Sequence, residues 1–379
     1  MIKSFLEEYV KLKNDKMIIF IIMIIPLVVN LLIGWELSKD VITNIPMAVL
    51  DKDNSELSRQ IIKYFSDNET FNIIYAQNEE ELEEWIHKSK VRAGMIIPKK
   101  FSSDVVTLKS PTILLLYDGS HMSIASTAKT IASEILLTIK TGAEMKQIQS
   151  RLNMTENQSY NVAMPISFSS RILYNPTKSF NNFLTPGLGM AICQIGIALT
   201  AVLSIIYEDK NNIKYVSGYL LGKIVFYALL GTISLMLAIF LQIYIIKIPF
   251  KGSFLEAFIL SLFLALAVSS LAILVSTLIE NRVIAIVVVG VLIIPNTIMA
   301  GYTWPVLSMS KSYSFLAWFI PFYHFADNIR NLFLKGTLNN LMGDIAFLFI
   351  FSLIMYGLSV LGIMLKASFR RKDKNETII

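Results

Sequence analysis

The sequence predicts a helical membrane protein with an α/β domain inserted after its first membrane-spanning helix. Three observations support this fold class: an apolar stretch at residues 17–37, a polar block at 38–180, and five further apolar stretches within 184–365. A helix of roughly 19 apolar residues is about 28 Å long, which matches a hydrocarbon core of about 30 Å. The composition agrees, because 54% of the residues are hydrophobic and only 16% are charged, against about 25% charged in soluble proteins.

The first 37 residues predict a surface helix followed by a membrane span. Within residues 1–16, apolar side chains recur at helical spacing, which predicts an amphipathic helix on the cytoplasmic face; they are Ile2, Phe5, Leu6, Tyr9 and Val10. Residues 17–37 form the first span. No small-residue cleavage site follows Gly34 and Trp35, so a retained anchor is favoured over a cleaved signal peptide.

The block at 38–180 alternates short apolar runs with amphipathic helical runs. The runs at 45–50, 71–75, 94–97 and 113–117 predict strands, and those at 55–65, 79–87 and 123–152 predict helices. Strands that alternate with helices are typical of an α/β domain, which we expect to contain a mixed sheet.

Five more spans are predicted at 184–206, 223–246, 255–279, 283–302 and 345–365. Between the last two, the segment at about 303–335 is rich in aromatic residues and broken by Pro305 and Pro321. Aromatic rings favour the membrane interface, so we expect a re-entrant or interfacial hairpin on the outer side, with a simple loop as the alternative.

Basic residues predict the orientation. They cluster in residues 1–16 and in the tail, 366–379, where Arg370, Arg371 and Lys372 lie. Positively charged segments stay in the cytoplasm, so both termini are expected there and the α/β domain outside. The net charge of +6 is therefore a topology signal, and no nucleic-acid partner is predicted.

Several kinds of site are excluded by the residues present. A single cysteine, Cys193, rules out an intrachain disulfide and a cysteine-based metal site. The three histidines are far apart in sequence, so no metal centre is expected. The run from Gly218 to Ile224 resembles a phosphate-binding loop but is one residue short and lacks the Ser or Thr that holds magnesium. Neither catalytic residues nor a bound cofactor are predicted.

The spans also lack the ionisable relay of an ion-coupled transporter. Charged groups persist at membrane depth only for function, and Lys223, Glu256 and Lys366 are all placed at span ends. If the protein transports, its energy should therefore come from a partner. Polar uncharged residues do occur within the spans, and we take Gln194, Thr200 and Asn296 as candidates for a substrate path. Hydrogen bonding between helices is the alternative explanation.

A short charged stretch separates the second and third spans. It begins with Tyr207, Glu208, Asp209 and Lys210 and is expected in the cytoplasm, where it could present a helix to another protein. A solvated loop is the alternative.

These motifs, in this order, resemble those of type-2 ABC transporter permeases of the drug-export branch. The resemblance covers nearly the whole chain and rests on the segments 49–55, 96–102, 117–120, 174–176, 183–187, 301–305 and 320–323. It implies a permease in the cytoplasmic (inner) membrane of a bacterium, which dimerises with a second copy or a paralogue and binds cytoplasmic ABC ATPase subunits.

The same resemblance implies a division of labour between subunits. ATP would be hydrolysed on the ATPase partner, and this chain would export a drug, lipid or peptide-like substrate. The loop at Tyr207, Glu208, Asp209 and Lys210 would contact the ATPase, although Asp209 to Asn212 replace the family's usual Gly-Thr. Membrane lipid and a periplasmic protein are further partners to consider. The alternative function is a non-transporting membrane scaffold or receptor whose outer domain binds a partner.

Overall fold

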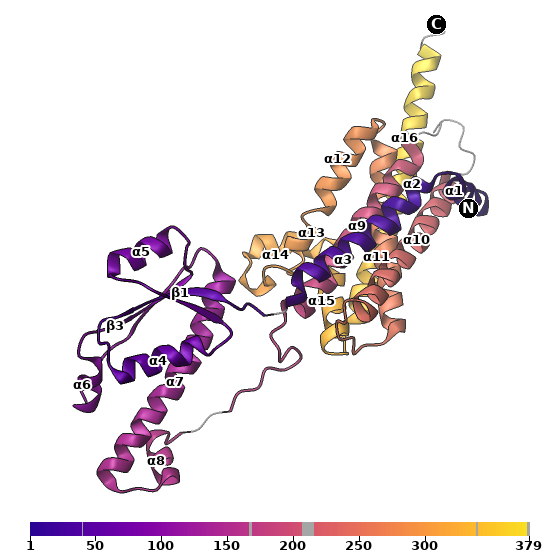
Figure 1. The fold of residues 1–379 in the computed structure, drawn as a ribbon. Helices are drawn as coiled ribbons and strands as arrows, with labels where there is room; N and C mark the ends of the chain where they lie inside the picture. The colour runs from indigo at the N-terminus through magenta and orange to yellow at the C-terminus, as the bar shows by residue number, and fades with distance from the viewer. Residues whose placement is uncertain (40, 167–168, 207–215, 339, 377–379) are drawn as a thin grey trace. The chain divides into compact units, whose positions relative to one another are not determined.

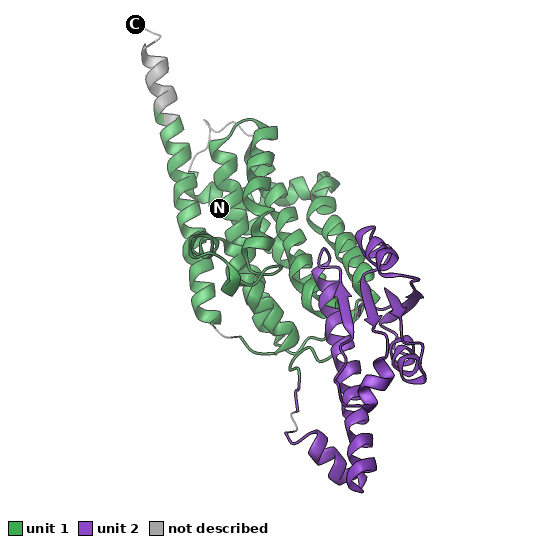
Figure 2. Ribbon diagram, turned by 90° about the vertical axis from the view of Figure 1, so that its left-hand side faces the viewer, with its two compact units in different colours: residues 1–40, 172–379 green, residues 41–171 purple. Residues whose placement is uncertain are grey.

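The computed structural model describes residues 1–39, 41–166, 169–206, 216–338 and 340–376. Within these, the chain forms two compact units, residues 1–40 with 172–379 and residues 41–171 (Figure 2). The first is entirely helical in its described part and the second contains a β-sheet. Each unit is described by itself.

The helical unit begins with a short surface helix and a first span that contains a π-helical turn. Helix α1 (Ile2–Asn14) is followed by α2 (Lys16–Ile19), the π-helical turn η1 (Phe20–Ile24), α3 (Ile25–Glu36) and the 3₁₀ turn η2 (Leu37–Lys39). The π-helical turn ends two residues before Pro26, which has no N–H to continue the α-helical pattern.

The rest of the helical unit follows residue 171 (Figure 1). It comprises α9 (Phe180–Ile206), α10 (Val216–Tyr244), α11 (Phe254–Leu278), α12 (Arg282–Ile293), α13 (Asn296–Met299), the 3₁₀ turn η4 (Val306–Ser308), α14 (Lys311–Trp318), α15 (Pro321–Leu334) and α16 (Leu341–Glu376). Among the described residues, six segments are long and apolar enough to cross a membrane: 16–39, 180–205, 216–244, 254–278, 282–299 and 341–366. The six predicted spans are therefore confirmed.

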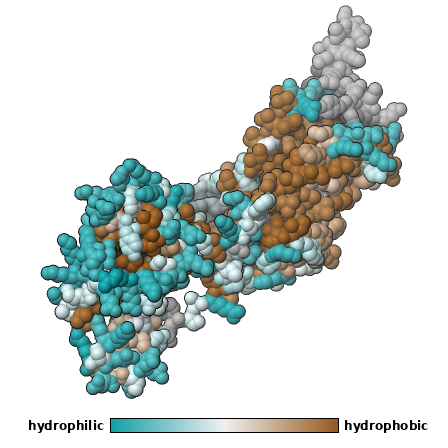
Figure 3. All heavy atoms as spheres, viewed as in Figure 1, coloured by the Kyte–Doolittle hydropathy of each residue, from teal (hydrophilic) through white to brown (hydrophobic). Residues whose placement is uncertain are grey.

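Apolar packing explains how these helices are arranged. Helices α9, α10 and α11 are mostly buried and supply much of one continuous core, whereas α3, α12 and α16 are mostly exposed. Apolar side chains cover much of the flank of this unit, and polar ones gather towards its ends (Figure 3). An apolar flank with polar ends is what a helix bundle needs in a bilayer.

The second unit is built on a four-stranded mixed sheet. Its elements are β1 (Ile45–Asp51), α4 (Glu56–Ser66), β2 (Phe71–Tyr75), α5 (Glu79–His87), β3 (Ala93–Ile97), α6 (Phe101–Val106), β4 (Leu114–Tyr117), α7 (Met122–Leu152) and α8 (Glu156–Ala163). The strand order is β2-β1-β3-β4, in which β1 pairs in parallel with β2 and β3, and β4 pairs antiparallel with β3.

Successive side chains of a strand point to opposite faces of the sheet, and both faces of this sheet are covered. On one face, Met47 and Val49 of β1 pack with residues of α4, α6 and α7. On the other, Ala48 and Leu50 pack with residues of α5, including Leu82. The result is a three-layer α/β unit with a small core on each side of the sheet.

Candidate functional site

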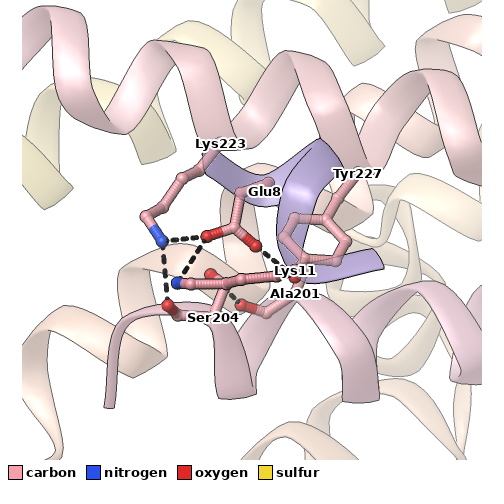
Figure 4. A network of polar contacts seen from close by, with 6 residues as sticks. All are labelled: Glu8, Lys11, Ala201, Ser204, Lys223 and Tyr227. Carbon is pink, nitrogen blue, oxygen red and sulfur yellow. Dashed lines mark hydrogen bonds and ion pairs between the residues drawn. The ribbon is translucent and has the colours of Figure 1, made fainter. Parts of the chain in front are cut away.

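A buried carboxylate on α1 joins this helix to the membrane spans. Glu8 is fully buried, and its carboxylate oxygens accept hydrogen bonds from Lys223 Nζ, from Lys11 Nζ at 2.9 Å and from the Tyr227 hydroxyl at 2.7 Å (Figure 4). Lys223 and Tyr227 lie one turn apart on α10, so both reach the same carboxylate from one helix face. A three-way contact of this kind fixes both the position and the rotation of α1.

The same network reaches the end of α9. Lys223 Nζ also donates to the backbone carbonyl of Ser204 at 2.9 Å, and the Ser204 hydroxyl donates to the carbonyl of Ala201 at 2.7 Å (Figure 4). A carbonyl in the last turn of a helix has no partner within that helix, so a lysine is well suited to bind it. The network therefore joins α1, α9 and α10 shortly before residue 207.

Electrostatics keep Glu8 ionised in this setting. Burial alone would raise the pKa of Glu8, but the nearby Lys223 and the hydrogen bonds from Lys223, Lys11 and Tyr227 outweigh it and hold the pKa below its ordinary value of 4.5. Glu8 and Lys223 are 0% and 1% exposed, so each compensates a charge that would otherwise be isolated in the protein interior.

Small residues on α10 allow α1 to approach closely. A Cβ atom at Gly222 would lie 2.4 Å from the carbonyl oxygen of Met1 and 3.0 Å from the side chain of Ser4. Both distances leave too little room for a methyl group, so Gly222 is required for the contact. Ser4 and Glu8 are the buried residues of α1, and Phe5 packs against Phe226 of α10. The side chains of Ile2, Leu6, Tyr9 and Val10 are exposed.

These observations revise one expectation. Lys223 does not lie at a span end; it is fully buried, and α10 begins seven residues earlier than predicted, at Val216. Its partner Glu8 is buried as well. The signal for this pair in the sequence is faint: a lone lysine within an apolar run, and a glutamate four residues after a small polar residue.

A second polar network lies among the spans themselves. Asn30 on α3 donates to the carbonyls of Pro26 at 2.8 Å and Gly189 at 3.2 Å. Gln242 on α10 donates to Asn30 Oδ1 at 2.8 Å and to the Thr185 carbonyl at 3.1 Å. These hydrogen bonds provide partners for polar groups that would otherwise bind water, and they connect the first three spans.

The carbonyl of Ile22 in the first span has a partner on α10. Pro26 has no N–H, so the carbonyl of Ile22 loses the donor that an α-helix would supply four residues later. The hydroxyl of Ser234 on α10 donates to this carbonyl at 2.5 Å. The hydrogen bond from Ser234 on α10 therefore replaces the backbone hydrogen bond that Pro26 of the first span cannot donate.

The three predicted substrate-path residues are all buried, but no hydrogen bond joins them to one another among the described residues. Gln194 is 1% exposed, and neither its amide oxygen nor its amide nitrogen has a partner in the described part of the chain. The Thr200 hydroxyl donates to the Gly196 carbonyl at 2.9 Å, and Thr200 lines a cavity of about 620 Å³ beside Glu8 and Lys11. Asn296 is 2% exposed and begins the short helix α13.

The predicted ATPase-coupling residues, Tyr207, Glu208, Asp209 and Lys210, lie outside the described residues. The structure describes the helix ends on either side of them. The preceding helix, α9, ends two residues after the Ser204 carbonyl that Lys223 binds, and the following helix, α10, carries Lys223 itself. The buried network thus borders both ends of this stretch. Within the described ranges, no group of three or more His, Cys, Asp or Glu residues could hold a metal ion.

Comparison with known proteins gives a consistent result. A family model described as "ABC-2 family transporter protein" matches residues 16–361. In Escherichia coli K12, the protein named "Probable multidrug ABC transporter permease YbhR" is 23% identical over 325 residues, which cover 83% of this chain and 85% of that protein. The E. coli K12 protein named "Probable multidrug ABC transporter permease YbhS" is 21% identical over 328 residues, or 84% of each chain.

A eukaryotic relative matches a smaller part. ABC transporter G family member 20 of Dictyostelium discoideum is 25% identical over 232 residues, which cover 58% of this chain and 31% of that protein. The family match spans all six candidate membrane helices almost completely, together with the α/β unit between the first and second. The chain belongs to the ABC-2 family of transporter proteins.

Proposed function

We propose that this protein is the membrane-spanning permease subunit of an ABC exporter, with ATP hydrolysed on separate ABC ATPase subunits. The observation that carries this conclusion is the family match over residues 16–361, which coincides with six membrane-spanning helices in one packed unit. The chain itself acts as a non-catalytic membrane subunit. Consistent with this role, the buried charge of Lys223 is compensated by Glu8, which also binds Lys11, whereas a proton or sodium relay needs a chain of exchangeable sites.

The ATPase docks on the stretch that begins with Tyr207, Glu208, Asp209 and Lys210. Its position supports this: it connects α9 to α10 at the end of the bundle where α1 is held by Glu8 and Lys223. A docking segment must transmit force to the spans, and the bonds from Lys223 to both α1 and α9 would let three helices respond together.

A second permease, either an identical copy or a paralogue, completes the transport unit. Helices α3, α12 and α16 leave much apolar surface exposed, which lipid and a second permease would cover. A periplasmic protein is a further candidate partner for the α/β unit.

Both termini are cytoplasmic and the α/β unit lies outside, in the cytoplasmic membrane of a bacterium. Six spans place the termini on the same side, and the basic residues Lys11, Lys13 and Lys16 border the first span. The α/β unit, residues 41–171, connects the first span to the second and is therefore on the opposite side.

The substrate path follows α9. An unpartnered buried amide costs about 1–3 kcal/mol, so the Gln194 side chain needs a partner such as water or substrate. Thr200, two turns along the same helix, lines the cavity next to α1. Asn296 contributes from α13, which packs against α9. The relatives named as multidrug permeases favour drug-like substrates, and lipids or peptide-like molecules also fit an apolar path with scattered amides.

Charge reversal in the connecting stretch tests the assignment of this chain as a permease coupled to an ATPase. Replacing Glu208→Lys and Asp209→Lys together places wrong charges in the proposed interface, which costs about 2–5 kcal/mol if the residues are buried there. We expect normal membrane abundance, weakened co-purification of the ATPase and reduced export. The matched control is Asp373→Lys in the tail, which should have no effect. Unchanged ATPase retention and export in the double variant would show that this stretch is merely solvated.

A further inference from the structure

A cavity of about 660 Å³ lies at the end of the helical unit away from α1. Its walls come from the turn after α13, from α14, from α15 and from the start of α16 (Figure 1). The volume is in the range of small-molecule sites, about 300–1,000 Å³. The cavity is separate from the Glu8 network and from the candidate path along α9, because it shares no lining residue with the cavity beside Thr200.

The floor of the cavity is a satisfied polar cluster. His324 Nδ1 lies 2.7 Å from Asp344 Oδ1, and His324 Nε2 lies 2.8 Å from the carbonyl oxygen of Trp318. Each ring nitrogen of His324 therefore lies within hydrogen-bond distance of an oxygen atom, one from α16 and one from the end of α14. The other Asp344 oxygen accepts from Asn328 at 2.7 Å. His324, Asp344 and Asn328 thus hold one another in the floor of the cavity through hydrogen bonds.

Two side chains of opposite charge, Asp327 and Arg330, line the cavity one turn apart on α15. The guanidinium of Arg330 donates from Nη2 to the Tyr302 carbonyl at 3.0 Å and stacks 4.0 Å from the centre of the Tyr302 ring. Its Nε is buried and has no hydrogen-bond partner among the described residues. Asp327 is exposed and accepts one bond, from Asn331 at 3.1 Å.

These two side chains do not neutralise each other directly. Within the described ranges, no nitrogen of Arg330 lies within ion-pair distance of an Asp327 oxygen, although helical spacing makes them neighbours. The cavity therefore offers an acceptor carboxylate and a donor guanidinium, separated along one helix face. A ligand that carries both an ammonium group and a phosphate matches this arrangement better than one that carries a single charge.

Exposed apolar and aromatic side chains near the cavity indicate its level in the membrane. Around it, the segment 304–319 exposes Trp304, Leu307, Phe315, Leu316, Trp318 and Phe319, each at least 47% accessible. Aromatic side chains of this kind concentrate at the membrane–water interface, where the headgroups of phospholipids lie. Acyl chains could then lie along the exposed apolar side chains of α14 while the headgroup enters the cavity.

From this geometry we propose that the cavity binds the headgroup of a zwitterionic phospholipid, with the ammonium group on Asp327 and the phosphate on Arg330. Trp318 and Tyr323 form aromatic walls beside the ammonium position. An anionic phospholipid shares the phosphate but would face Asp327 without a compensating ammonium group. The site therefore selects zwitterionic over anionic headgroups.

Native mass spectrometry of the full-length protein in mild detergent tests this selection. The protein is supplied with equal amounts of phosphatidylethanolamine and phosphatidylglycerol, and the ratio of retained lipids is measured. We expect about ten times as much phosphatidylethanolamine as phosphatidylglycerol to be retained. This ratio assumes that the contact between the ammonium group and Asp327 raises the affinity by about a factor of ten. In Asp327→Asn the ratio should fall towards one. Lys311→Gln, a charge change on exposed α14 outside the cavity, should leave the ratio unchanged.

Two further measurements separate the headgroup from other sources of binding. Soluble glycerophosphoethanolamine should displace the retained lipid only at much higher concentration, because it has the same headgroup chemistry but no acyl chains. Arg330→Lys, which keeps the positive charge, should lower retention of both lipids without changing their ratio. The proposal is overturned if the wild-type protein shows no preference, or if Asp327→Asn keeps the wild-type ratio.

Discussion

Removing the carboxylate of Glu8 should release α1 from the spans. In Glu8→Gln the Lys223 ammonium stays buried and loses its ion pair with the Glu8 carboxylate, while its bond to the Ser204 carbonyl remains. Removing one partner of a buried ion pair costs about 3–5 kcal/mol, whereas replacing both partners is often close to neutral. Each 1.4 kcal/mol is a tenfold change in an equilibrium constant, so the docking equilibrium of α1 should fall by at least about 100-fold.

Hydrogen exchange of the backbone amides of residues 2–14 measures this release directly. An isolated helix of this length is marginal in water, so an undocked α1 should exchange rapidly. We expect exchange at least about 100-fold faster in Glu8→Gln than in the wild type, with export reduced to a similar degree if α1 must be docked for coupling. Glu7→Gln, the exposed neighbour on the same helix, serves as the matched control and should resemble the wild type.

A double variant distinguishes electrostatic anchoring from simple packing. Glu8→Gln combined with Lys223→Met removes both charges, so α1 should regain most of its protection. The pH dependence has a definite sign: the folded pKa of Glu8 is below 4.5, so its stabilising effect is present above pH 4.5 and is lost as the pH falls through the folded pKa. If the single and double variants exchange equally fast, or if Glu8→Gln exchanges like the wild type, the ion pair does not hold α1.

Two further predictions concern the substrate path and the orientation. Gln194→Leu should leave thermal stability in detergent unchanged or raised, because no hydrogen bond to the described part of the chain is lost, while export falls. Gln242→Leu should lower stability by about 1–3 kcal/mol, because its bond to Asn30 is lost. Normal export in Gln194→Leu would remove this residue from the path. In a variant whose native cysteine is replaced, a single cysteine at Ser133 should react with an impermeant thiol reagent in intact cells, and one at Ser368 should not. Both side chains are exposed, so burial would not prevent the reaction. The reverse labelling pattern would show that the topology is the opposite of the one proposed.

The membrane spans could be predicted from sequence because hydrophobic length alone decides whether a helix can cross a bilayer. The error at the start of α10 has a physical cause. Lys223 looks like a span end when its neighbours in sequence are considered, but its partner Glu8 is 215 residues away. Once the pair forms, the lysine is neutralised and the helix extends back to Val216. Pairing over such a separation leaves no periodic pattern that sequence reasoning could detect.

In the candidate site, too, the sequence indicates which residues are unusual but not which partners they bind. Gln194 and Thr200 could be identified because polar residues are unusual inside apolar spans, but the sequence could not tell which amide finds a partner. Asn30 and Gln242 bind each other, whereas Gln194 has no partner in the described part of the chain. The difference depends on which helices are neighbours, and that is fixed by tertiary packing. The cluster of His324 and Asp344 was likewise hidden, because α15 and α16 meet only in the folded unit.

Transport measured in membrane vesicles tests the central claim most directly, once a substrate has been found by screening drug-like compounds. The vesicles contain this permease with its ATPase partner, and uptake is followed with ATP, with ATP after collapse of the proton gradient, and with an ATPase subunit inactivated at its catalytic residue. Because the buried Lys223 is ion-paired with Glu8 and the proposed energy source is ATP hydrolysis on the partner, transport should survive loss of the gradient and stop with the inactive ATPase. Transport driven by the gradient without ATP would contradict the assignment as the permease subunit of an ABC exporter.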